Sequence, residues 1–273
     1  PGPRCGHTLT ALGVGPGAGD GGGPDVGGAH LAHVQLVLFG GATALENSSK
    51  QGSPAPMSPG GGGSGIRLAG ATAEVHLFNV HAGVWDKIEP AGEGPSPRAA
   101  HAAAAVGHMV VIQGGIGPLG LASDDLHVLD FTNPDKPRWH RVMVQGPGPR
   151  ARYAHTLTLV AQRYLVAIGG NDGRQILNDA WSLDTSEKPY RWTKLDYQGE
   201  EPPARMYAST CARQDGLLLL SGGRDVSSTP LADAYGLARH RDGAWEWTAA
   251  PGVSPSSRYQ HTSVFVGGRL HVA

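Results

Sequence analysis

Apolar and polar residues alternate along this chain in segments too short for helices. The clearest copy contains the run 156–160, Thr-Leu-Thr-Leu-Val, which alternates as a half-buried strand does. The next run, 164–170, is almost continuously apolar, as is typical of a strand covered on both faces. Alternation in 179–184 predicts a third strand, and the short segment 191–195 supplies a fourth. We therefore expect a structural unit of four strands.

This four-strand unit is repeated along the chain. Four tryptophans are separated by 54, 53 and 53 residues, at Trp85, Trp139, Trp192 and Trp245. An arginine follows each of them after 13 residues, at Arg98, Arg152, Arg205 and Arg258. A Gly-Gly pair follows three of these arginines after 16 or 17 residues, at 114–115, 169–170 and 222–223. An earlier copy starts at Arg4, and a repeat of about 50 residues predicts a β-propeller.

We therefore expect an all-β propeller fragment with four four-stranded blades and the first two strands of a fifth, from Arg258 to Ala273. The 42 glycines, the 21 prolines and the 16% of charged residues suit short strands and tight turns. Sheets that stack radially need bulky apolar residues between them and places of close backbone approach. The tryptophans are therefore expected to be wedges between blades, and the Gly-Gly pairs to be packing positions.

The first repeat is longer than the others. It runs 94 residues from Arg4 to Arg98, against 53 or 54 in the later copies. The extra residues fall within 13–35 and 42–72, which we expect to be loops on opposite faces of the propeller. The second insertion is rich in glycine, serine and proline and has little apolar surface, so it is predicted to be mobile.

Charge and hydropathy exclude several partners. The net charge is -1, so no broad basic face is predicted for nucleic acid or an anionic membrane. No run of about 18 apolar residues predicts a membrane span. Two cysteines, Cys5 and Cys211, are too few for a secreted disulfide framework, which favours an intracellular protein. The first residue is not methionine and the last three stop inside a strand pattern, so a longer parent protein is expected.

The order of landmarks within each repeat resembles the Kelch repeat. The landmarks are Arg-x-x-His, a strand, Gly-Gly, an acidic residue before the third strand and then Trp. Members of the Kelch family fold as β-propellers with usually six blades. Several segments are more specific, among them 36–46, 96–101, 164–173 and 216–225. They resemble the N-terminal Kelch domain of plant serine/threonine phosphatases implicated in brassinosteroid signalling. This resemblance spans all 273 residues.

The resemblance implies further parts of the parent protein. In that family the propeller precedes a metal-dependent phosphatase domain, which is therefore expected beyond Ala273 with two divalent ions of the manganese or iron type. It also implies action on phosphorylated kinases of the glycogen-synthase-kinase type, in the cytoplasm and nucleus. The phosphatase motifs G-D-x-H-G, G-D-x-V-D-R-G and G-N-H-E are absent from this chain, so we expect no catalytic residues and no cofactor within it.

A metal centre in the propeller is the alternative that the histidines raise. His7, His101, His155 and His261 recur at equivalent positions of the first strands, but the fourth repeat has Ala208 there. A residue repeated once per blade is more often a local hydrogen-bonding group than a ligand. We therefore predict no metal site in this chain.

Arginines at one face of the propeller are the main candidates for partner binding. The loops from a fourth strand to the next first strand, and from a second to a third strand, open on the same face, which we call the rim. Proline-rich loops deliver an arginine to the same place in each blade, at Arg4, Arg98, Arg152, Arg205 and Arg258. Two interpretations stay open for these arginines. They form a ring that binds carboxylate or phosphate, or they brace the blades by pairing with Glu74, Asp125, Asp179 and Asp233.

Less repetitive rim residues are better candidates for selectivity, because a structural role would recur from blade to blade. They are Asn171, Asp172, Arg174, Arg224 and Asp225. The function expected from these features is a protein-binding propeller that recruits or orients a phosphorylated partner, such as a glycogen-synthase-kinase-like kinase, for the phosphatase domain. Two alternatives are a substrate adaptor of a ubiquitin ligase and a metal-assisted Kelch enzyme of the specifier type.

Overall fold

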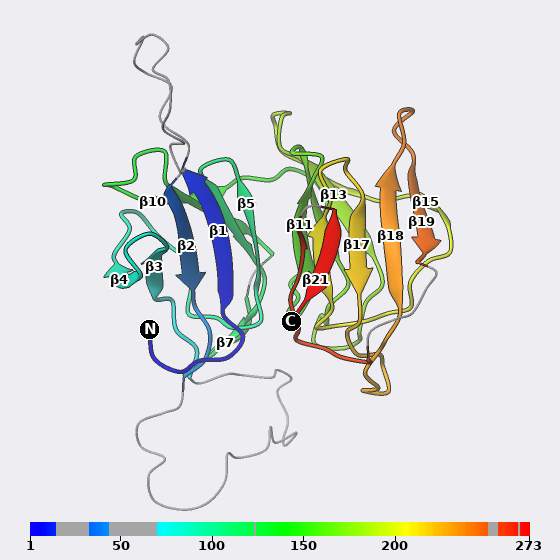
Figure 1. Ribbon diagram of the computed structural model, residues 1–273, viewed down its shortest axis with the longest axis horizontal. Helices are drawn as coiled ribbons and strands as arrows, with labels where there is room; N and C mark the ends of the chain where they lie inside the picture. Colours follow the sequence, from blue (N-terminus) through cyan, green and yellow to red (C-terminus); the bar gives the residue numbers. More distant parts are fainter. Residues whose placement is uncertain (15–32, 44–69, 123, 251–255, 267) are drawn as a thin grey trace, which may run out of the picture.

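A computed structural model describes most of the chain as strands and turns (Figure 1). The described residues are 1–14, 33–43, 70–122, 124–250, 256–266 and 268–273. Most of both predicted insertions, 13–35 and 42–72, lies outside the described residues, so the predicted mobility stays a prediction. In the described part of the chain, no helix has the length and apolar character needed to cross a membrane.

Four antiparallel sheets follow one another along the described chain. The first blade consists of β1 (Thr8–Val14), β2 (His33–Phe39), β3 (Val75–Asn79) and β4 (Val84–Ile88). The second consists of β5 (Ala102–Val106), β6 (Met109–Gln113), β9 (Leu126–Asp130) and β10 (Arg138–Val142). The third consists of β11 (Thr156–Val160), β12 (Tyr164–Ile168), β13 (Ala180–Asp184) and β14 (Trp192–Lys194).

The fourth blade is built in the same way, from β16 (Ser209–Ala212), β17 (Leu218–Ser221), β18 (Ala234–Arg239) and β19 (Trp245–Ala249). A final pair, β20 (Ser263–Val266) and β21 (Arg269–Val272), forms the beginning of a fifth. The all-β fold class is thus confirmed. The innermost strands β1, β5, β11, β16 and β20 pack against one another in succession, as radial blades require.

Two features of the sheets were not predicted. A small hairpin of β7 (Ile116–Gly117) and β8 (Gly120–Leu121) projects from the rim loop of the second blade. A short strand, β15 (Tyr197–Gly199), pairs in parallel with β19 and makes the fourth blade five-stranded.

The β15 strand illustrates how the outer edges are covered. Single parallel bridges join Ala91 to Arg138 and Gln145 to Arg191, so linkers between the earlier blades make the same contact. In each case the linker that leaves one blade pairs with the outermost strand of the next. This pairing satisfies backbone groups that an open sheet edge would leave exposed.

Buried apolar clusters lie between consecutive blades, and the tryptophans are part of them. Trp139 of the second blade packs edge-to-face on Phe39 of the first, with ring centroids 5.4 Å apart. Trp245 of the fourth blade packs on Tyr164 of the third at 5.9 Å. Trp192 joins the cluster between the second and third blades. These contacts confirm the prediction that the tryptophans are wedges between blades.

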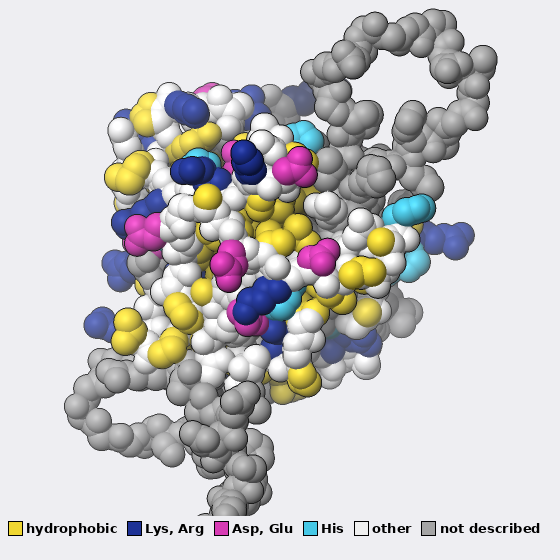
Figure 2. All heavy atoms as spheres, turned by 90° about the vertical axis from the view of Figure 1, so that its left-hand side faces the viewer, with side chains coloured by type: hydrophobic (Ala, Val, Ile, Leu, Met, Phe, Trp, Pro, Cys, Tyr) yellow, Lys and Arg dark blue, Asp and Glu magenta, His cyan; other side chains and the backbone are white. Residues whose placement is uncertain are grey.

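Trp85 is the exception, because no described sheet covers its side of the first blade. Its ring lies 4.9 Å from Phe78 of the same sheet and is 36% exposed. Val80 and Val84 nearby are exposed as well. Figure 2 faces this side of the molecule and shows apolar side chains exposed among charged ones.

Candidate functional site

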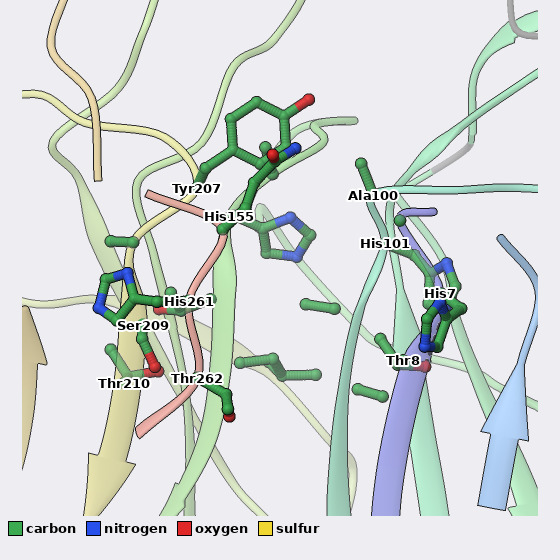
Figure 3. Close-up of a pocket in the computed structure, with 18 of the residues that line it drawn as sticks. His7, Thr8, Ala100, His101, His155, Tyr207, Ser209, Thr210, His261 and Thr262 are labelled. Atoms are coloured by element: carbon green, nitrogen blue, oxygen red, sulfur yellow. Dashed lines mark hydrogen bonds between the residues drawn. The ribbon is translucent and has the colours of Figure 1, made fainter. Parts of the chain in front are cut away.

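The innermost strands surround a cavity of about 780 Å³ that opens toward the rim. Its lining comes from the starts of β1, β5, β11 and β16 and from the residues that precede them, and also from residues 260–262 before β20 and from Ala273. Figure 3 shows His7 and His101 on one side of the cavity and His155, Tyr207 and His261 on the other. All five blades therefore contribute side chains to one central space.

A chain of backbone hydrogen bonds runs around the mouth of this cavity. The N–H of Ala100 donates to the carbonyl of Gly6 at 2.7 Å, and that of Ala154 donates to Ala100 at 2.7 Å. Tyr207 donates in turn to Ala154, and Gln260 donates to Tyr207, each at 2.9 Å. All five residues have positive φ, between 51° and 63°. This left-handed turn, placed two residues after each repeated arginine, ties successive blades together at the rim.

Two of the predicted rim arginines lie inside the blades. Arg152 donates to both carboxylate oxygens of Asp179, at 2.6 and 3.0 Å, and to the carbonyl of Gly169 at 3.0 Å. Arg205 makes the same contacts with Asp233, at 2.6 and 2.9 Å, and with Gly222 at 2.9 Å. The exposed fraction of each arginine is 2%. Each guanidinium therefore joins the end of a second strand to the start of a third.

The first two blades vary this arrangement. Arg98, also 2% exposed, donates to the carbonyl of Gly114 at 2.9 Å and to Ser96. Arg4 donates to Gly40 at 3.2 Å and to Glu74 at 2.9 Å. Hydrogen bonds from Lys87, then from Arg4 and His76, lower the pKa of Glu74 to about 2.

Arg98, Arg152 and Arg205 thus have contacts that fit the bracing interpretation. Arg98, Arg152 and Arg205 are buried with their donors engaged, so a ligand would have to break these bonds to reach them. This placement does not support the ring interpretation for those three residues. Arg258 is half-exposed and hydrogen bonds only to Ser256 among the described residues, so partner contact there stays a prediction.

His101, His155 and His261 pack over the Gly-Gly pair of the preceding blade. A Cβ atom added to Gly114 would lie 2.7 Å from Cε1 of His155, and one on Gly40 would lie 3.0 Å from Cε1 of His101. The hydroxyl of Thr8 lies 2.8 Å from Nε2 of His101. In the described part of the chain, no group of three or more His, Cys, Asp or Glu side chains is placed to hold a metal ion. The histidines therefore act as packing groups between blades.

Acidification is predicted to destabilise this packing. Burial lowers the pKa of His101 and His155 to about 3, from an ordinary value of 6.5. Between pH 3 and pH 6.5 these histidines bind protons in the unfolded chain but not in the folded chain. Their contribution to stability is therefore fully present above pH 6.5, and below it the free energy of unfolding falls by about 1.4 kcal/mol per histidine for each pH unit. Urea titrations at pH 7.5 and 5.5, above the range of carboxylate titration, should show this loss, and His155→Gln should reduce it. A free energy of unfolding that is equal at the two pH values would contradict the assignment.

The predicted selectivity residues fall into two kinds. The side-chain oxygens of Asn171, Asp172 and Asp225 accept hydrogen bonds from N–H groups of their own loops, at 2.6 to 2.9 Å, and thereby shape the rim. Arg174 is exposed, and neither Arg174 nor Arg224 belongs to an ion pair found in the described residues. These two arginines are the positively charged members of the five residues.

Aromatic and apolar rim residues were missed by the sequence reasoning. Tyr153, Tyr207 and Tyr259 lie near one another around the channel mouth, each one or two residues after a repeated arginine. Leu119 at the tip of the β7–β8 hairpin is 92% exposed, and Val226 in the rim loop of the fourth blade is 71% exposed. The tyrosines next to the arginines were the available signal, whereas nothing in the repeat pattern singled out the two loop tips.

Residues 60–273 match the family model of the KLHDC2/KLHL20/DRC7 Kelch-repeats domain. The chain belongs to the Kelch-repeat family. This Kelch domain is 65% identical over 240 residues to serine/threonine-protein phosphatase BSL2 of Arabidopsis thaliana, a match that covers 88% of the chain and 23% of that protein. The resemblance to plant phosphatases with N-terminal Kelch repeats is confirmed.

Other relatives also match over part of their length. Adagio-like protein 1 of Oryza sativa subsp. japonica is 33% identical over 205 residues, which are 74% of the chain and 32% of that protein. Kelch domain-containing protein 2 of Bos taurus is 34% identical over 150 residues, or 55% of the chain and 35% of that protein. The chain thus spans about a quarter to a third of the relatives it matches. These matches support a protein-interaction propeller.

Proposed function

We propose that this Kelch propeller binds a phosphorylated signalling protein at its rim and presents it to a serine/threonine phosphatase domain of a longer protein. The 65% identity to a serine/threonine-protein phosphatase, of which the match covers only 23%, supports the phosphatase part of the proposal. The partner we propose is a kinase of the glycogen-synthase-kinase type in brassinosteroid signalling, in the cytoplasm and nucleus. The phosphatase domain would hold two divalent metal ions of the manganese or iron type.

Exposed apolar side chains on the rim are the observation that carries the binding role. Leu119, Val226 and Tyr259 are 92%, 71% and 43% exposed. They come from the second, fourth and fifth blades, yet all lie in loops that open on the rim, the lower face in Figure 1. Large exposed apolar residues on otherwise polar loops are candidates for contacts that a protein partner covers.

The loops that carry these residues are fixed rather than free. Arg98 bonds to Gly114 at the start of the Leu119 loop, and Arg205 joins Gly222 to Asp233 at the two ends of the Val226 loop. The backbone hydrogen-bond chain includes Gln260, next to Tyr259. A preordered binding surface loses less conformational entropy when the partner binds. The repeated arginines therefore support recognition indirectly, by positioning the residues that make contact.

A double charge substitution tests the rim. We expect Leu119→Asp/Val226→Asp to weaken binding of a phosphorylated glycogen-synthase-kinase-type kinase by tenfold or more, because it places carboxylates in the apolar contact. The measurement is a titration by isothermal calorimetry with this chain. Val80→Asp is the matched control, since Val80 is 48% exposed in the turn between β3 and β4 on the opposite face. Equal affinities for the wild type and the double variant would refute the rim as the binding surface.

A further inference from the structure

Arg224 occupies a special position on the rim. It directly follows the Gly222-Gly223 pair, where the first three blades have Ala42, Ile116 and Asn171. Its backbone is bridged to Met206 on one side and to Pro230 on the other. The side chain is therefore held at the channel mouth, and it is the one cation among these four equivalent residues.

The contacts of this guanidinium are aromatic rather than acidic. Its central carbon lies 5.3 Å from the ring centroid of Tyr207 and 5.9 Å from that of Tyr259. One terminal nitrogen lies 3.6 Å from the sulfur of Met206, which is a weak acceptor. Its Nε atom is buried without a hydrogen-bond partner, and none of the ion pairs within the described residues includes Arg224. A half-buried cation that no described carboxylate neutralises is suited to receive an anion from outside the chain.

The conformation of Tyr207 points to the same place. Its φ is +56°, in the left-handed region that Gly6, Ala100 and Ala154 occupy in the earlier blades. A bulky residue in this region carries backbone strain, and such strain is concentrated at binding and active sites. This backbone conformation places the Tyr207 ring at the cavity (Figure 3) and beneath Arg224. Gly6, Ala100 and Ala154 fill this backbone position in three blades and Gln260 fills it before β20, so the position itself does not require an aromatic ring.

We propose that Arg224, supported by Tyr207 and Tyr259, binds one carboxylate or phosphate group carried by a peptide segment of the partner. The other terminal nitrogen, Nη1, has no hydrogen-bond partner among the described residues, so its N–H groups are the donors that an oxyanion would meet. Tyr153 and Met206 are buried in one cluster against which Tyr207 packs, so apolar surface lies beside the site and lowers the local dielectric. The inference rests on the proposed function and assigns its anion contact to one residue.

Three fluorescein-labelled peptide pools test this assignment. The pools have randomised flanks and differ only in the central residue, which is phosphoserine, glutamate or serine. Fluorescence anisotropy with the full 273-residue chain should show at least tenfold tighter binding of one or both anionic pools than of the serine pool. Arg224→Gln should abolish this preference. Preference for phosphoserine over glutamate identifies phosphate as the anion, and the reverse order identifies carboxylate.

Control variants separate the anion site from general charge and from misfolding. Arg241→Gln removes an exposed arginine from the turn between β18 and β19, on the face opposite the rim, and should leave the preference intact. Arg224→Lys keeps the charge but loses the paired donors, so it should retain only part of the preference. If the melting temperature of Arg224→Gln differs from that of the wild type, Arg224→Lys takes its place as the test variant.

The inference and the proposed function fail in different ways. An anion preference that survives in Arg224→Gln, or a wild type that binds the three pools equally or not at all, would overturn the inference. Kinase binding that depends on Leu119 and Val226 would still uphold the proposed function in that case. If the affinity for the kinase does not change when those two residues are replaced, the proposed function is wrong, even if Arg224 selects anions.

Discussion

Replacement of Arg152 by methionine is expected to lower the free energy of unfolding of this chain by about 3–5 kcal/mol. The arginine is 2% exposed and donates to both oxygens of Asp179 and to the carbonyl of Gly169. Methionine fills similar volume but leaves the carboxylate with Trp181 as its remaining side-chain donor, at 2.7 Å. The loss follows from an uncompensated charge and an unsatisfied carbonyl in the interior of a blade. Urea denaturation followed by tryptophan fluorescence measures it.

Arg163→Met is the matched control for this substitution. Arg163 also pairs with an aspartate, Asp184, but its side chain is 44% exposed and the pair lies at the surface. Water solvates both charges when such a pair is broken, so the denaturation midpoint should hardly move. If the two methionine variants were equally destabilised, the buried arginine could not be the brace that joins two strands of its blade.

Gly114→Ala is expected to cost about 2–5 kcal/mol, because two penalties coincide at this residue. Its φ is +65°, in the left-handed region that disfavours a Cβ atom. The added methyl group would also lie 2.3 Å from the carbonyl oxygen of Arg152 and 2.7 Å from Cε1 of His155 in the next blade. Relief of this overlap would push the second and third blades apart. Thermal and urea unfolding of the chain measure the loss.

Gly107→Ala isolates the conformational part of that cost. Gly107 has nearly the same φ, +58°, but a Cβ atom there would meet nothing within 4 Å. It should therefore lose only about 1–2 kcal/mol. A loss as large as that of Gly114→Ala would show that backbone conformation alone explains the Gly-Gly pairs, and close packing between blades would not be needed.

Repetition made the fold predictable from the sequence. Each blade meets the same packing requirement, so Trp192 and Gly169 recur in equivalent form in the neighbouring blades. Short alternating runs then fixed the strands within each repeat. The β15 strand escaped prediction because its pairing with β19 joins two blades, and a pattern within one blade carries no information on that contact.

The rim could be located from the sequence, but its chemistry could not. Spacing placed Arg152 and Arg205 at the correct end of each blade without showing whether their guanidinium groups point inward or outward. The guanidinium groups point inward to carbonyl oxygens at the ends of the second strands. Every residue type has such a backbone acceptor, so the sequence does not reveal this contact. The contacts of Arg224 with Tyr207 and Tyr259 likewise join loops of two blades, so only the folded chain brings them together.

Hydrogen–deuterium exchange tests most directly the claim that the rim is the partner-binding surface. The chain would be compared alone and saturated with a phosphorylated glycogen-synthase-kinase-type kinase. We expect slower exchange in the rim loops 116–121 and 224–231, because the partner covers them, and unchanged exchange in the turns 80–83 and 107–108 on the opposite face. Slower exchange confined to the opposite turns, or no change anywhere at saturation, would contradict the account.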